Sequence, residues 1–123
     1  MDSQKFQTPS EKQPPVPAMP TNEELYDTAD KLKDAGKLEE AVAKYAEIVA
    51  QDPNFALAHS ALAVVCGRLG RHDEAVQHGR RVCELEPNDA FSFTALSVTY
   101  QRAGKIPEAE DAMARARMMQ GQH

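Results

Sequence analysis

The sequence predicts an all-α fold, an α-solenoid of three helix-turn-helix repeats with six antiparallel helices. The first observation behind this prediction is a period of 34 residues, which brings Gly36, Gly70 and Gly104 into register. The second is that the same shift aligns three alanines and two prolines, namely Ala41, Ala75, Ala109, Pro53 and Pro87. The third is the composition, 41% hydrophobic but only 6% aromatic, which is typical of helices that pack closely through alanine, leucine and valine side chains.

Residues 1–21 are predicted to form a flexible, proline-rich tail. Five of the eight prolines lie in this segment, which has few apolar residues and no periodic pattern. Such a segment buries too little apolar surface to offset the entropy lost on ordering, and residues 14–20 favour the polyproline II conformation. A ligand for an SH3-like domain is the less favoured interpretation, because no arginine or lysine directly flanks the proline cluster.

The first helix is predicted to begin after Thr21, which forms a capping box with Glu24. Gly36 can adopt the positive φ that ends this helix, Pro53 ends the second helix, and Asn54 is predicted to cap the third. Pro107 falls in the first turn of the last helix, where a missing N–H does no harm. The six helices are predicted at residues 22–35, 38–51, 56–69, 72–85, 90–103 and 107–119.

Small residues recur where neighbouring helices must approach closely. They are Ala29, Ala63 and Ser97 on the first helices and Ala41, Ala75 and Ala109 on the second helices. Larger side chains are expected to fill the space around them, namely Leu32, Tyr45, Leu62, Leu96 and Tyr100. Each helical pair leaves one face uncovered, so three stacked repeats are about the minimum for a stable array.

The repeat pattern resembles that of the tetratricopeptide repeat family. In the middle repeat it is carried by Leu62, Ala63, Cys66, Gly70, Ala75, Val82 and Pro87, and in the third by Phe93, Leu96, Ser97, Tyr100, Gly104, Ala109 and Ala116. The first repeat carries Leu25, Ala29, Leu32, Gly36, Ala41, Tyr45 and Pro53, with Thr28 where leucine is usual. The resemblance implies a repeat domain at residues 22–123, with repeats at 22–55, 56–89 and 90–123.

The resemblance also implies a non-catalytic adaptor or scaffold whose first helices line a concave, protein-binding groove. Projecting the helical period onto those helices gives the candidate residues Glu23, Tyr26, Asp30, Lys33, Leu57, Ser60, Val64, Arg68, Phe91, Thr94, Val98, Gln101 and Arg102. Several are apolar without being needed for the core, which favours a binding site over half-buried packing positions. The predicted ligand is an apolar or amphipathic peptide, with Arg68 and Arg102 meeting an acidic residue.

Members of the family that clamp a chaperone's C-terminal carboxylate use lysine, asparagine and arginine along the groove. The corresponding positions here hold Tyr26, Asp30, Val64, Thr94 and Val98, none of which donates a charged hydrogen bond. A chaperone tail is therefore not the expected ligand.

The charge and the termini bear on other classes of partner. The net charge of −5 argues against nucleic acid or an anionic membrane as the main partner. No apolar run approaches the roughly 18 residues that span a bilayer, and the N-terminus lacks the apolar core of a signal peptide, so a cytoplasmic location is expected.

No catalytic, cofactor or metal site is predicted. Cys66 and Cys83 are not spaced as a metal pair and fit best as small buried hydrophobes. His59 and Cys66, seven residues apart, could share a helix face, but a buried histidine beside a buried cysteine is the favoured interpretation.

Two alternatives to the adaptor function remain open. Ala112, Met113, Ala116 and Met119 are expected to present an apolar edge without cover from the chain itself, which would suit a homodimer or a self-assembling structural subunit formed through the C-terminal helix. The other alternative is a small client-holding chaperone that uses the same groove.

Overall fold

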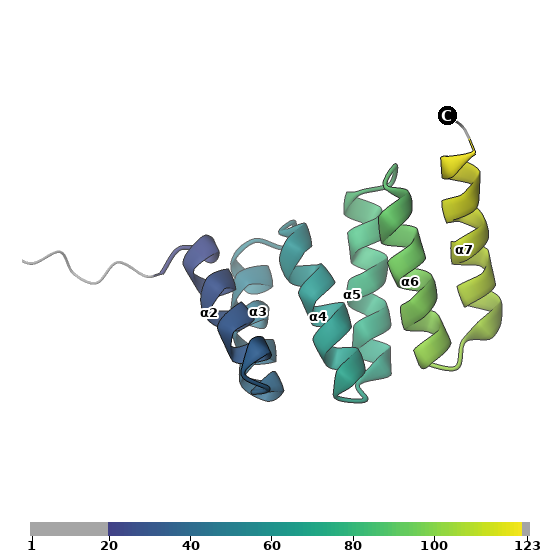
Figure 1. Ribbon diagram of the computed structural model, residues 1–123. Helices are drawn as coiled ribbons and strands as arrows, with labels where there is room; N and C mark the ends of the chain where they lie inside the picture. Colours follow the sequence, from purple (N-terminus) through teal and green to yellow (C-terminus); the bar gives the residue numbers. More distant parts are fainter. Residues whose placement is uncertain (1–19, 122–123) are drawn as a thin grey trace, which may run out of the picture.

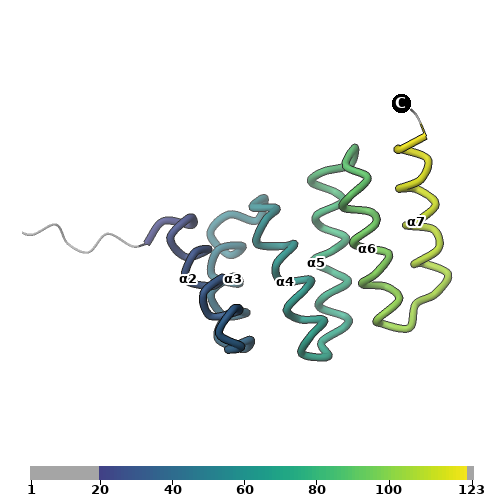
Figure 2. Tube along the Cα trace, viewed as in Figure 1, coloured from purple at the N-terminus to yellow at the C-terminus, as the bar shows by residue number. Residues whose placement is uncertain are grey.

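The computed structural model describes residues 20–121, and in this range it contains six α-helices and no strand (Figure 1). The helices are α2 (Asn22–Asp34), α3 (Leu38–Gln51), α4 (Ala56–Arg68), α5 (His72–Leu85), α6 (Ala90–Arg102) and α7 (Ile106–Gln120). They form three antiparallel pairs that stack side by side along one direction (Figure 2). The predicted all-α solenoid is confirmed, and the predicted bounds agree with the observed ones to within one residue. The predicted tail lies outside the described residues except for Pro20 and Thr21.

Local signals account for most helix ends. The hydroxyl of Thr21 accepts the Glu24 N–H at 3.1 Å, and the Thr21 N–H donates to the Glu24 carboxylate at 2.8 Å, which completes the predicted capping box. Gly36, Gly70 and Gly104 take φ values of 81°, 80° and 78° at the turns inside the three pairs, a region that only glycine enters readily. Pro107 lies in the first turn of α7, as expected.

The prediction that Asn54 caps the third helix is wrong. The N-cap of α4 is Phe55, which makes no side-chain capping bond. Asn54 lies one residue too early, with its N–H donating to the Asp52 carboxylate at 3.0 Å and its side-chain oxygen accepting from Arg81 at 2.7 Å. The next repeat has Asp89 in the register of Phe55, and this aspartate does cap α6 by accepting the Phe91 N–H.

The buried side chains form two separate clusters. The first spans α2 to α5 and consists of Leu25, Ala29, Ala41, Tyr45, Ile48, Ala58, Leu62, Val65, Cys66 and Ala75. The second joins the end of α5 to the third pair and consists of Cys83, Phe93, Leu96, Ala112 and Ala116. All six small positions picked from the sequence are buried, and both cysteines are buried and free, as predicted.

The expected uncovered edge on the last helix needs correction. Ala112 and Ala116 are buried in the second cluster, and Met119 packs partly against it. The physical reason is that this face of α7 packs against its partner helix α6. The exposed apolar residues of α7 are instead Ile106 and Met118, with 49% and 67% of their surface accessible.

Candidate functional site

The first repeat contributes little open surface to the predicted groove, because Tyr26 and Asp30 make contacts within the chain. The Tyr26 ring packs edge-on against Tyr45, with ring centroids 5.7 Å apart, and lies 6.2 Å from Phe55. The Tyr45 hydroxyl donates to the Asp30 carboxylate, which also pairs with Lys33 at 3.8 Å. Burial and the hydrogen bond to Asp30 raise the pKa of Tyr45, so this hydroxyl keeps its proton and remains a donor.

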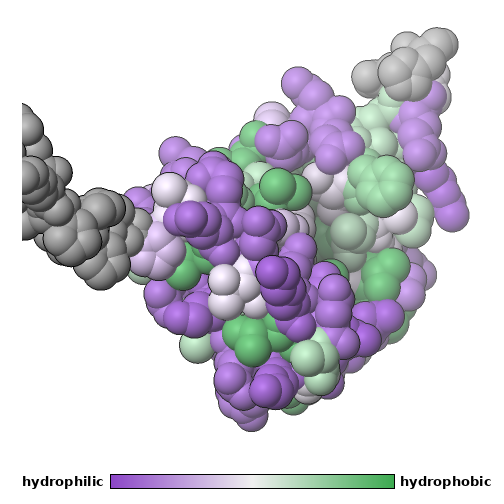
Figure 3. Space-filling model, turned by 60° about the vertical axis from the view of Figure 1, so that its left-hand side comes forward, coloured by the Kyte–Doolittle hydropathy of each residue, from purple (hydrophilic) through white to green (hydrophobic). Residues whose placement is uncertain are grey.

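The second and third repeats expose the apolar side chains that the sequence placed in the groove. The exposed fractions are 60% for Leu57, 50% for Val64, 81% for Phe91 and 38% for Val98. Ser60 and Arg68 on α4 are also exposed, as are Gln101 and Arg102 on α6. Thr94 is half-buried and donates its hydroxyl to the Ala90 carbonyl at 3.1 Å. In Figure 3, hydrophobic residues border a hollow in the surface, whereas the surface nearer the N-terminal end is mostly hydrophilic.

A pocket of about 380 Å³ opens between α4 and α6, with α5 at its floor. It is lined by Ser60, Ala63, Val64, Gly67, His72, Gly79, Val82, Ser92, Ala95, Leu96, Val98, Thr99 and Arg102. Four of the predicted groove residues are therefore brought together here: Ser60, Val64, Val98 and Arg102. The others lie outside this pocket, and Gln101 lines a second one with Met113, between α6 and α7.

Gly79 on α5 lines the pocket, and reasoning from the sequence missed it. The residues in register with Gly79 are Tyr45 in the first repeat and Met113 in the third. Tyr45 is fully buried and fills the corresponding space in the first repeat. Gly79 has no side chain, and Leu96 packs close to it instead, since a Cβ atom at Gly79 would lie 3.1 Å from Leu96 Cδ1; the pocket adjoins this contact. Comparing the residue types at this one register position would have revealed the missing side chain.

The charge around the pocket is one-sided. Its lining contains no aspartate or glutamate, and Arg102 is the residue in it that carries a permanent charge. Arg71 and Arg81 are paired with glutamates at 2.8 and 3.0 Å, whereas Arg102 forms no ion pair with another residue in the range 20–121. The Arg102 guanidinium is thus available to an acidic group at the pocket mouth.

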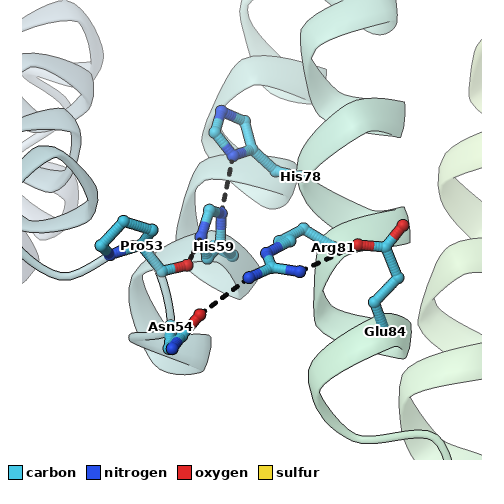
Figure 4. Close-up of polar contacts among 6 residues, drawn as sticks. All are labelled: Pro53, Asn54, His59, His78, Arg81 and Glu84. Atoms are coloured by element: carbon cyan, nitrogen blue, oxygen red, sulfur yellow. Dashed lines mark hydrogen bonds and ion pairs between the residues drawn. The ribbon is translucent and has the colours of Figure 1, made fainter.

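A polar cluster formed by α4, α5 and the turn before α4, none of whose labelled residues lines the pocket, holds two histidines in contact (Figure 4). His59 Nε2 lies 2.8 Å from the Pro53 carbonyl oxygen, which can only accept, so Nε2 carries the proton. The other ring nitrogen of His59, Nδ1, lies 3.0 Å from His78 Nδ1, so a proton on one of these two nitrogens joins the rings by a hydrogen bond. Arg81 joins the same cluster by bonding to Asn54 and to Glu84.

The contacts in this cluster argue against His59 and Cys66 acting as a reactive imidazole and thiol pair. Both ring nitrogens of His59 are engaged by Pro53 and His78, so neither is available as a base for Cys66. Burial raises the pKa of the Cys66 thiol, which disfavours the reactive thiolate. Within residues 20–121 no three histidine, cysteine, aspartate or glutamate side chains are grouped as metal ligands. None of the helices in that range is both long and apolar enough for a bilayer crossing.

Several solved structures share this fold. MamA is 18% identical with a TM-score of 0.76 over 83% of this chain, which spans 60% of the MamA chain. YrrB, described as a tetratricopeptide repeat protein with an unusual peptide-binding site, is 22% identical with a TM-score of 0.76 over 86% of this chain and 55% of its own. The second such domain of Spaghetti (RPAP3), bound to the HSP90 peptide SRMEEVD, is 18% identical with a TM-score of 0.72 over 92% of this chain and 98% of its own.

The sequence comparisons identify a family but no individual curated relative. No curated protein matches the sequence at a significant level. A sequence model described as "Tetratricopeptide repeat" matches residues 26–90, more than half of the chain. The chain belongs to the tetratricopeptide repeat family.

Proposed function

We propose that this protein is a non-catalytic adaptor that binds a segment of another protein in the concave groove between α4 and α6. The observation that carries this proposal is the pocket of about 380 Å³ with Val64 and Val98 exposed at its mouth. Pockets of this size, mostly apolar and with a few polar groups, are typical binding sites. Tetratricopeptide repeats are protein-interaction scaffolds, and the RPAP3 domain and YrrB, which share the fold, are described with a bound peptide and a peptide-binding site.

The groove favours an apolar or amphipathic segment. Leu57 and Phe91, in register on α4 and α6, expose most of their surface and extend the apolar area beyond the pocket. An exposed apolar surface of this kind marks an interaction site, since water contact with it is unfavourable. At the first-repeat end, Tyr26 and Asp30 are held by Tyr45, so this end is less open to a ligand.

A second candidate function is self-association through α7, favoured by the exposure of Ile106 and Met118. In that case the mass in solution would be that of a dimer or larger species, and Met118→Glu would reduce it to that of the monomer. A monomeric mass at all concentrations would exclude this candidate.

The groove proposal is tested by co-purification from a lysate of the source organism with tagged wild type and tagged Val64→Glu/Val98→Glu. The matched control is Ala43→Glu/Ala50→Glu, because both alanines are exposed on α3, a helix that lines neither pocket, and the two substitutions add the same charge. All variants must first show the same helicity and melting temperature. A protein retained by wild type and by Ala43→Glu/Ala50→Glu but lost from the Val64→Glu/Val98→Glu variant supports the groove. Identical partners for all three variants would contradict it.

A further inference from the structure

We infer that the pocket above Gly79 is an anchor site for one large apolar side chain, preferably aromatic, that lies next to a carboxylate in the bound segment. This inference rests on the proposed groove function and goes further by naming the chemistry of the ligand.

The pocket has room for a whole aromatic side chain. An apolar cavity of about 150 Å³ is enough to hold benzene, and the volume here is about 380 Å³. The walls carry short side chains where α4 and α6 approach each other, namely Ala63, Gly67 and Ala95. A Cβ atom at Gly67 would meet nothing within 4 Å, so the space beside α4 is open before a ligand arrives. A rigid aromatic ring would bury a large area there at a small cost in side-chain entropy.

The polar groups of the lining select against a polar anchor. The Ser92 hydroxyl already donates to Asp89 at 2.8 Å, and the Thr99 hydroxyl donates to the Ala95 carbonyl at 3.1 Å. Their protons are therefore committed within the chain, whereas the buried Nδ1 of His72, also in the lining, has no hydrogen-bond partner within residues 20–121. Apart from a contact with this one nitrogen, a polar side chain entering the pocket would lose hydrogen bonds to water without replacing them fully, which is costly, whereas an apolar one would not.

The positive charge of the lining favours an acidic residue next to the anchor side chain in the bound segment. Arg102 lines the pocket and makes no ion pair with another residue of the described range, and no acidic side chain lines the pocket to repel an incoming carboxylate. A carboxylate adjacent to the anchor would accept a charge-assisted hydrogen bond from the Arg102 guanidinium. A basic neighbour would instead meet a like charge at the mouth of the pocket.

The test is selection of peptides from a random library displayed on phage, with the full-length protein as bait, followed by affinity measurements on the recovered peptides. The expected peptides share an aromatic or large aliphatic residue beside aspartate or glutamate. Arg102→Gln is expected to weaken their binding about tenfold, which corresponds to about 1.4 kcal/mol. The matched control is Arg80→Gln, since Arg80 is an exposed arginine on α5 that lines neither pocket and is not among the groove residues. This control should bind as wild type does.

A second pair of variants tests the anchor itself. Val98→Glu places a charge at the pocket mouth and should abolish binding, while Ala50→Glu, which adds the same charge at an exposed position of α3 outside the pocket, should leave it unchanged. Peptides that lack the apolar and acidic pair, or that bind Val98→Glu as well as wild type, would overturn the inference. The groove function would still stand if those peptides lost affinity on Val64→Glu. Recovery of no peptide would contradict both the groove function and the anchor site.

One further variant distinguishes a partner from the chain's own tail. If Phe6 occupied the pocket, Phe6→Ala would bind the recovered peptides more tightly than wild type. That result would overturn the assignment of the pocket to a separate protein, whereas equal affinities support it.

Discussion

Gly79→Ala is expected to stabilise the protein by about 0.5 to 1 kcal/mol, even though the position is buried. Gly79 lies in the interior of α5, where alanine is favoured over glycine by about 0.8 to 1.0 kcal/mol. Against this gain, the new Cβ would lie 3.1 Å from Leu96 Cδ1, a few tenths of an ångström inside the ordinary contact distance of about 3.5 to 4.0 Å. Leu96 borders the open pocket and can move away at little cost, so the gain should prevail.

The assay is urea unfolding followed by far-UV circular dichroism, with wild type, Gly79→Ala and Gly67→Ala compared at constant m-value. Gly67 also lines the pocket, in the last turn of α4, but a Cβ there meets nothing within 4 Å. Gly67→Ala should therefore show the propensity gain without the contact cost. A loss of stability in Gly79→Ala alongside a gain in Gly67→Ala would refute the reasoning, since it would show that Leu96 cannot move into the pocket.

Three further predictions concern a buried hydroxyl, a half-buried imidazole and a buried thiol. Ser97→Ala should lower the free energy of unfolding by about 0.5 to 1.5 kcal/mol in denaturant titration, because the buried hydroxyl donates to the Ala109 carbonyl at 2.8 Å; an unchanged value would contradict this. Burial and the adjacent His59 lower the pKa of His78 in the folded protein. Below the unfolded pKa of about 6.5, the unfolded state therefore binds more protons than the folded state, and the folded state loses stability as the pH falls. The melting temperature should accordingly fall between pH 7 and pH 5 by more in wild type than in His78→Gln. Burial raises the pKa of Cys83 to about 11, so at neutral pH a disulfide reagent should label this thiol slowly in the folded protein and fast in urea; fast labelling of the folded protein would argue against this burial.

The helices could be predicted from the sequence because their ends are set by local chemistry. Thr21 and the glycines such as Gly36 act within one turn of themselves, so the sequence nearby contains the whole signal. Asn54 shows the limit of such reasoning, since a shift of one residue moves its side chain out of reach of the N–H groups that a cap must satisfy.

The candidate site was harder to predict because it depends on contacts between repeats. The helical period identified Val64 and Val98 as exposed, but it carries no information on what lies beneath them. Tyr26 looked equally available in the sequence, yet it packs against Tyr45 and Phe55 from other helices. The contact of His59 with His78 joins two helices across 19 residues, and no short motif marks it.

The division of the buried side chains into two clusters has a consequence for how the chain opens. Helix α5 contributes Ala75 to the first cluster and Cys83 to the second, so α6 and α7 are joined to the rest through α5 and the neighbouring face of α4. We expect the amide protons of α6 and α7 to exchange with deuterium sooner than those of α3 and α4, as a separate cooperative unit. A ligand seated between α4 and α6 would couple the two units and slow that exchange, so occupancy could be read at α7, a helix that does not line the pocket.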